Sequence, residues 1–136
     1  MTTGITIFNT KRRIGKTERR IREYALSLNE KLRQSGTPLT ISVKSEKTEG
    51  GYRLLIDVVS EKGNELKGET LKMANKLRGY AMLFNALFRN DKLPAFVEAK
   101  KEELENGYRL IVEIKMEEGI IKYEKELEEK RKMKQR

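Results

Sequence analysis

The chain has 136 residues, of which 37% are apolar and 38% are charged, and its formal net charge is +9. This length is typical of one domain, and the apolar fraction is large enough for a hydrophobic core. The sequence contains neither Cys nor His, which excludes disulfide bonds, thiolate zinc sites and mechanisms that depend on imidazole. Carboxylate, Lys, Tyr, Ser and Thr chemistry remain, together with binding of a hard cation by Asp or Glu. We predict a non-enzymatic single domain over residues 1–136 that needs no cofactor.

Two absences bear on where the protein works. No apolar run approaches the roughly 18 residues that a bilayer-spanning helix needs. The first residues also lack the pattern of positive and then apolar segments that marks a secretory signal. These absences favour a cytoplasmic protein without a membrane partner.

The first expected elements are a strand and a helix. Residues 4–9 predict a short strand at the edge of a sheet, because Ile5, Ile7 and Phe8 form a brief apolar run. Thr17 matches a helix N-cap, so we expect the first helix to begin there.

The densest charge in the sequence lies around that predicted helix start. It comprises Lys11, Arg12, Arg13, Lys16, Arg19, Arg20 and Arg22. Four of them, Arg12, Lys16, Arg19 and Arg20, would share one side of a helix. Cations at a helix N-terminus oppose the helix dipole, so this placement favours a function, contact with phosphates, over a merely solvated helix start. The solvated helix start remains the alternative.

Residues 17–63 form the first of two predicted helix-strand-strand units. Helical spacing relates the apolar residues Ile21, Ala25, Leu28 and Leu32. Gly36 and Pro38 end the predicted helix. Residues 39–44 and 52–58 then alternate between apolar and polar, with a turn at 49–51, which predicts a β-hairpin.

Residues 73–119 repeat this unit at a displacement of 56 residues. Between 18–63 and 74–119, fifteen of 46 aligned positions are identical, and Gly51-Tyr52-Arg53-Leu54 matches Gly107-Tyr108-Arg109-Leu110. The second helical face comprises Ala74, Leu77, Ala81, Phe84 and Phe88. Asn106-Gly107 predicts the turn between strands at 95–102 and 108–116. An internal repeat of this kind indicates two copies of one structural unit.

A basic helix or tail at 120–136 completes the predicted α+β fold, whose order is helix-strand-strand twice and then a helix. We expect a four-stranded antiparallel sheet with the helices packed on one face. The other face would carry ten polar residues and four apolar ones, Leu55, Val59, Phe96 and Ile111. A twofold-related copy, the end segments or a ligand could cover that face.

Several polar residues recur in both units. Arg22, Asn29 and Arg33 recur as Arg78, Asn85 and Arg89. We expect them to bond to strand ends or carbonyl groups within each unit; a pseudo-symmetric polar surface is the alternative. Asp57 and Glu113 are also equivalent, and we expect cross-strand pairing with Lys44, Lys100 or Arg53 rather than a metal site.

The predicted order of elements is similar to that of LAGLIDADG homing endonucleases, which use a sheet as a DNA-binding saddle. In that family the helix ends in an acidic residue that binds metal. Here the first predicted helix ends Asn29-Glu30-Lys31-Leu32-Arg33-Gln34-Ser35-Gly36, without that motif. The similarity therefore implies no catalytic residue in this chain.

The distribution of charge indicates a polyanionic partner. Residues 1–36 hold nine Lys and Arg against three Glu, and residues 119–136 hold seven against four, whereas residues 37–118 balance at fourteen each. Our leading hypothesis is nucleic-acid binding, to DNA or RNA, through the N-terminal cluster, with Arg53 and Arg109 on the sheet and the basic tail as further contacts. The first alternative is a protein-interaction module that forms a homodimer or grips a partner through the partly apolar sheet face. The second is a designed scaffold, which fits the ideal Asn106-Gly107 turn but not the unequal repeats.

Overall fold

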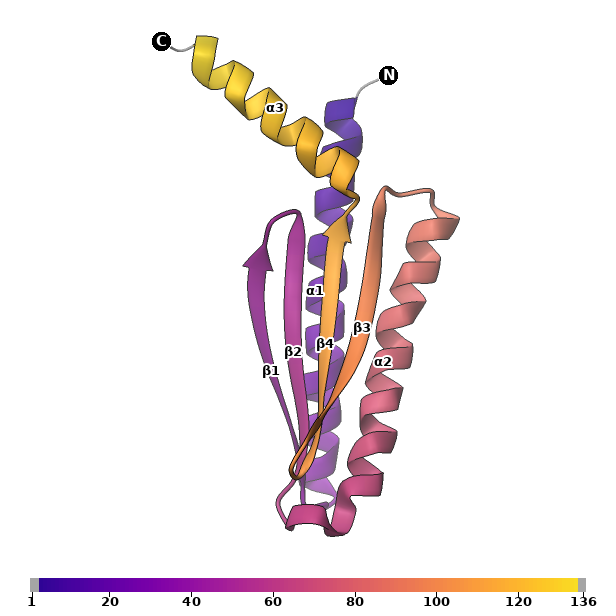
Figure 1. Ribbon diagram of the computed structural model, residues 1–136. Coiled ribbons are helices and arrows are strands. Elements are labelled where there is room, and N and C mark those ends of the chain that lie inside the picture. The colour runs from indigo at the N-terminus through magenta and orange to yellow at the C-terminus, as the bar shows by residue number, and fades with distance from the viewer. Residues whose placement is uncertain (1–2, 135–136) are drawn as a thin grey trace.

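The fold is that of a computed structural model, which describes residues 3–134 and the side chains of residues 7–134 except Asn64. In chain order the elements are α1 (Thr3–Gln34), β1 (Leu39–Thr48), β2 (Gly51–Ser60), the 3-10 helix η1 (Gly63–Leu66), α2 (Lys67–Asn90), β3 (Ala95–Leu104), β4 (Gly107–Met116) and α3 (Glu118–Lys134). This order confirms the predicted α+β fold with its duplicated helix-strand-strand unit (Figure 1).

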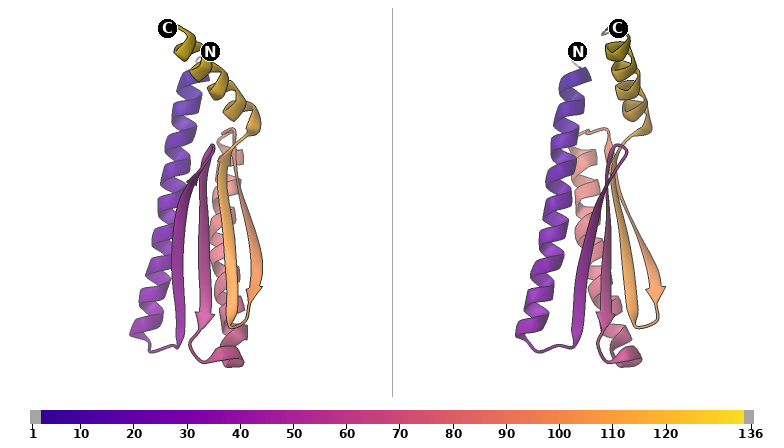
Figure 2. Two further views of the ribbon diagram at one scale, coloured as in Figure 1. Left: turned by 60° about the vertical axis from the view of Figure 1, so that its left-hand side comes forward. Right: turned by 90° about the vertical axis from the view of Figure 1, so that its left-hand side faces the viewer.

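The four strands form one antiparallel sheet in the order β1-β2-β4-β3. The two hairpins meet at β2 and β4, which pair from Gly51 opposite Lys115 to Val59 opposite Gly107. Figures 1 and 2 show α1 and α2 on one face of the sheet, while no helix in the described part of the chain covers the other face. Because β2 and β4 are antiparallel, an approximate twofold rotation relates the two units, and α1 and α2 run in opposite directions.

The core lies between the sheet and the two long helices. Ile21 of α1 and Leu77 of α2 are fully buried against Leu54, Ile56 and Leu110 on the central strands. These strand residues alternate with polar ones, so the apolar side of each strand faces the helices. The apolar helical spacing read from the sequence is therefore the spacing that forms the core.

The predicted edge strand at 4–9 and the helix start at Thr17 are both wrong, because α1 already begins at Thr3. Ile7, Thr10 and Ile14 are buried and extend the core-facing side of the helix toward its N-terminus. The Thr17 hydroxyl donates to the carbonyl oxygen four residues earlier at 2.8 Å, a bond that lets a threonine sit inside a helix. Because Thr10 and Thr17 are polar residues at core-facing positions, the pattern of apolar residues alone did not show that the helix extends to Thr3.

Two glycines allow the close approach of β2 and β4. A Cβ atom on Gly51 would lie 1.7 Å from the carbonyl oxygen of Ile114, and one on Gly107 would lie 2.0 Å from the carbonyl oxygen of Val58. The two contacts are equivalent under the 56-residue repeat. The strands that join the two units therefore approach too closely for any side chain at these positions.

An asparagine from each long helix caps the outer edge of the sheet. Asn29 Oδ1 accepts a hydrogen bond from the backbone N–H of Ile41 on β1 at 2.9 Å, and Asn85 Oδ1 accepts one from Val97 on β3 at 3.0 Å. These bonds, with one from Arg78 Nε to the Ala99 carbonyl oxygen at 3.3 Å, confirm the expected contacts with the strands for three of the six recurring residues. For Arg22 and Arg33 the expectation is wrong, because they pair with Glu18 and Glu30 of their own helix. Each cap occupies one backbone N–H of an edge strand, which is then not available to a strand of another chain.

Asn29→Ala and Asn85→Ala are each expected to lower the free energy of unfolding by about 1 kcal/mol, because each change leaves a part-buried backbone N–H without a partner. The measurement is urea unfolding followed by circular dichroism. Asn90→Ala, at an exposed position on α2, serves as the control and should change little. Equal midpoints for Asn85→Ala and Asn90→Ala would contradict the capping role.

The last helix, α3, corresponds to the predicted basic segment 120–136, of which Gln135 and Arg136 lie outside the described residues. Figure 2 shows that it leaves the end of β4 and lies near the first turns of α1, which extend past the sheet. Lys11 Nζ on α1 and Glu124 on α3 form an ion pair at 2.6 Å. In the described part of the chain, no helix has a stretch that is both long and apolar enough to cross a membrane.

Candidate nucleic-acid interface

Most of the positive charge of the protein lies in the helices, and the sheet is nearly neutral. The two helices α1 and α2 hold fourteen Lys and Arg against four Glu, a net charge of +10. The four strands hold seven basic residues against six acidic ones. The two helices, whose outer surface we call the helix face, therefore carry a net charge as large as that of the whole protein.

All seven predicted residues of the N-terminal cluster lie in α1. They begin eight residues after the first residue of the helix, so they lie beyond its first turn, to which the dipole effect is limited. The expectation that their placement opposes the dipole is therefore wrong. What distinguishes these residues is their exposure and their partners.

Four of the seven form an exposed stripe without acidic partners. Arg12, Lys16, Arg19 and Arg20 are exposed, on the side of α1 opposite the buried Ile14 and Ile21. Among the described residues, none of the four has a carboxylate within ion-pair distance. We call these four residues the α1 stripe. These four side chains are therefore exposed to solvent.

The other three residues of the cluster form ion pairs within the protein. Lys11 pairs with α3, as described above. Arg13 donates to Asp91 Oδ2 at the end of α2 at 2.7 Å, and its guanidinium lies 5.9 Å from the centre of the Phe88 ring. Arg22 pairs with the buried Glu18 at 3.1 Å. Their charges are thus partly neutralised by carboxylates within the protein.

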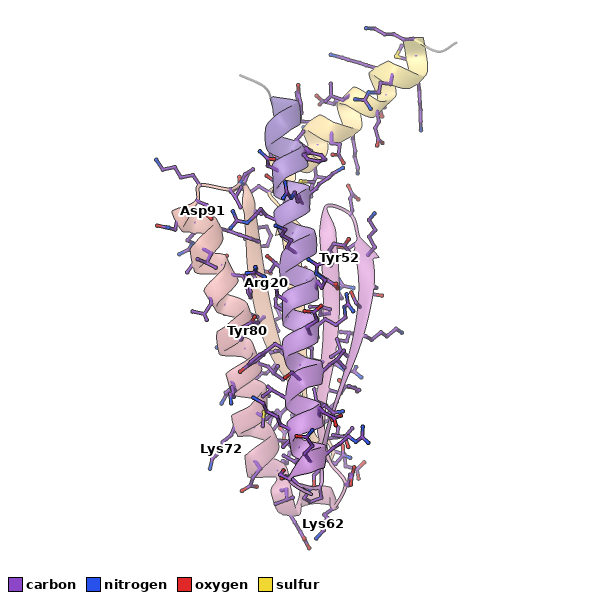
Figure 3. All side chains as sticks on the ribbon, turned by 180° about the vertical axis from the view of Figure 1, so that it is seen from behind. Arg20, Tyr52, Lys62, Lys72, Tyr80 and Asp91 are labelled. Atoms are coloured by element: carbon purple, nitrogen blue, oxygen red, sulfur yellow. The ribbon has the colours of Figure 1, made fainter. Side chains whose placement is uncertain are left out.

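A shallow groove separates the α1 stripe from α2. It has a volume of about 250 Å³ and is lined by Arg13, Lys16, Thr17, Arg20, Phe84 and Leu87. Figure 3 shows Arg20 on the α2 side of α1 and Tyr80 on the facing side of α2. Tyr80 stacks on Tyr24 with ring centres 4.0 Å apart, which bridges the two helices beside the groove. Cations on α1 thus lie next to exposed apolar surface on α2.

The predicted sheet residues Arg53 and Arg109 lie on the uncovered face, where both are already paired. Arg109 makes two hydrogen bonds to Asp57, at 2.7 and 3.0 Å. Arg53 lies 3.0 Å from Glu113, and its hydrogen bond is the main reason that the pKa of the Glu113 carboxyl lies below its ordinary value. Both carboxylates thus pair across strands, as expected. Glu113 has one of the predicted partners, Arg53, whereas Asp57 pairs with Arg109, which was not among them. The sheet arginines are therefore less available to phosphates than the α1 stripe.

Sequence reasoning missed two exposed lysines of α2. Lys72 and Lys76 are exposed on the helix face, and Figure 3 labels Lys72 on α2. They fall in the segment 37–118, whose charges cancel when they are counted along the chain. A count for each predicted helix and strand would have found them, because the acidic residues of this segment lie mostly in strands and loops.

No group of three or more carboxylates that could hold a metal ion occurs among the described residues. Comparison with known proteins adds no functional information. No protein-family model matches the chain, and neither a search of curated proteins nor one of solved structures finds a match.

Proposed function

We propose that this is a non-enzymatic nucleic-acid-binding protein whose helix face contacts the phosphate backbone. The observation that carries the proposal is the α1 stripe, four adjacent exposed cations without a carboxylate partner in the described part of the chain. Phosphate contacts require free Lys and Arg donors, and clustered cations gain affinity by releasing counterions from the nucleic acid. The exposed lysines of α2 extend the same surface.

The test is binding of the purified protein to labelled duplex DNA, single-stranded DNA and structured RNA. Each is titrated with salt from about 50 to about 200 mM, a range in which several phosphate contacts lower the affinity steeply. An unrelated protein of the same net charge is the control. We expect tighter binding than the control and a preference for one of the three nucleic acids. Binding no tighter than that of the control would refute the proposal.

The uncovered sheet face supports a second candidate function, binding of a protein partner. This face carries five basic and five acidic side chains, namely Lys44, Arg53, Lys100, Arg109 and Lys115, and Glu46, Asp57, Glu98, Glu102 and Glu113. Its zero net charge, in a protein of +9, makes it a surface on which two copies can meet without strong repulsion. Sedimentation velocity of the wild type and of Leu55→Lys separates the candidates. A dimer that Leu55→Lys dissociates would favour protein binding, whereas nucleic-acid binding by the helix face should be insensitive to this change.

A further inference from the structure

The outer flank of the second unit contains a large basic cleft between α2 and the edge strand β3. The cleft has a volume of about 980 Å³. Its charged lining residues are Arg78, Arg89, Lys92, Lys100, Glu98 and Glu117. Figure 1 shows α2 and β3 side by side at this edge of the molecule. The cleft lies on the side of α2 away from α1, so it is separate from the α1 stripe.

The repeat shows how this flank differs from its counterpart in the first unit. In the first unit Arg22 pairs with Glu18 at 3.1 Å, and Arg33 pairs with Glu30 at 3.3 Å. The residues 56 positions after the two glutamates are Ala74 and Ala86. The third glutamate of α1, Glu23, is likewise replaced by Gly79. Every acidic residue of α1 thus has an uncharged counterpart in α2, while the two arginines are kept as Arg78 and Arg89.

The kept arginines consequently have free donors. Among the described residues, Arg78 donates only its Nε–H, to the carbonyl oxygen of Ala99 at 3.3 Å. Arg89 has no hydrogen-bond or ion-pair partner among the described residues. A guanidinium has five N–H donors, so most of the donors of both arginines have no acceptor in the part of the chain that the structure describes.

Backbone conformation supplies an independent observation at the mouth of the cleft. Lys92 follows α2 with φ +54°, the left-handed region that disfavours side chains other than glycine. Its counterpart in the first unit is Gly36, with φ +70° and the same pattern of helix-ending hydrogen bonds. The second unit therefore places a lysine, at a conformational cost, where glycine would fit without strain.

We propose that the α2–β3 cleft binds the phosphates of one nucleic-acid strand, through Arg78, Arg89 and Lys92. This inference rests on the proposed function and adds a second phosphate site to it. Arg78 and Arg89 are eleven residues apart, about 16 Å along the helix, which matches about five phosphates of a stacked strand. An acidic peptide could satisfy the same charges, but the Val97 N–H and the Ala99 carbonyl oxygen of β3, two groups that an extended peptide would pair with beside the cleft, are already bonded to Asn85 and Arg78.

Two matched double variants test the cleft. Arg78→Gln/Arg89→Gln and Arg22→Gln/Arg33→Gln remove the same number of charges at equivalent positions. We expect the first to weaken binding of labelled DNA or RNA by at least about tenfold at low salt, and to make the slope of log K against log salt shallower by about 1.8. The second should change both quantities much less, because Arg22 and Arg33 are already paired with Glu18 and Glu30. Equal effects of the two doubles, with wild-type binding intact, would overturn the cleft and leave the proposed function standing.

Two single substitutions test the cleft in case the double variants do not fold. Ala86→Glu restores, at an exposed position, the partner that Arg33 has in the first unit, and it should weaken binding more than Gln34→Glu, which adds the same charge at the far end of α1. Lys92→Gly should raise the midpoint of urea unfolding and weaken binding, two changes that a purely structural lysine would not combine. Unchanged binding of Lys92→Gly would contradict a role for this residue.

Competition with inorganic tripolyphosphate tests whether the cleft itself binds phosphate groups. Displacement of the oligonucleotide by tripolyphosphate at the same concentration for both matched doubles would argue against the cleft. If the wild type bound no nucleic acid, the proposed function would fail on its own. Tripolyphosphate binding that Arg78→Gln/Arg89→Gln alone abolishes would then still establish a phosphate site, and its absence would overturn the cleft as well.

Discussion

Neutralising the α1 stripe, with Arg12, Lys16, Arg19 and Arg20 all changed to Gln, is expected to lower the affinity for nucleic acid by roughly a hundredfold at low salt. If each side chain makes one phosphate contact, the slope of log K against log salt becomes shallower by about 3.6. The fold should be unaffected, because the four side chains are exposed and have no partner among the described residues. The measurement is fluorescence anisotropy of a labelled oligonucleotide over a series of salt concentrations.

A control for this prediction must remove four charges elsewhere. The variant in which Lys44, Lys47, Lys62 and Lys115 are changed to Gln does so on the strands and on the loop after β2. Long-range attraction depends on net charge, so it should weaken equally in both variants, whereas direct contacts are lost only from the stripe. Comparable losses of affinity in the two variants would show that binding is non-specific attraction by net charge.

Gly51→Ala is expected to destabilise the protein by about 3 kcal/mol or more, because its Cβ would lie 1.7 Å from the carbonyl oxygen of Ile114. Backbone on the facing strand cannot move aside as a flexible side chain can. The change therefore forces β2 and β4 apart at one end of their ladder. Gly107→Ala should act similarly at the other end, where the Cβ would lie 2.0 Å from the carbonyl oxygen of Val58. The measurement is the free energy of unfolding from urea titration.

The matched control is Gly79→Ala, where a Cβ would meet no other atom within 4 Å. Gly79 lies in the interior of α2, so alanine there should stabilise the helix by about 0.5 to 1 kcal/mol. The two glycine substitutions are thus expected to have opposite signs. A small loss of stability for Gly51→Ala would mean that the central strands can separate locally at little cost.

The sequence predicted most of the fold because the duplication and the local patterns agreed. Ile21, Leu77 and their neighbours follow the helical period, and the apolar residues of the strands alternate, so each signal stood out without tertiary information. The start of α1 did not stand out, because Thr10 and Thr17 occupy buried positions that a hydrophobic pattern leaves blank.

The candidate site could be predicted only in part. The α1 stripe is a local feature of one helix, so its composition was enough to locate it. The partners that engage Arg13, Arg53 and Arg109 lie 78, 60 and 52 residues away in sequence, and only the folded arrangement brings them together. The cleft beside α2 was also not predicted. Its arginines lack partners because Ala74 and Ala86 replace the glutamates of the first unit, and the absence of a carboxylate leaves no pattern in the sequence.

The pairing of β2 with β4 resembles an isologous interface that has been enclosed within one chain, since equivalent residues meet across an approximate twofold axis. Two identical subunits joined in this way would have to carry identical flanks. Joining them covalently removes that constraint, so one half can keep its arginines neutralised while the other leaves them free. The asymmetry of charge between the two edges of this sheet is therefore available only to a fused pair.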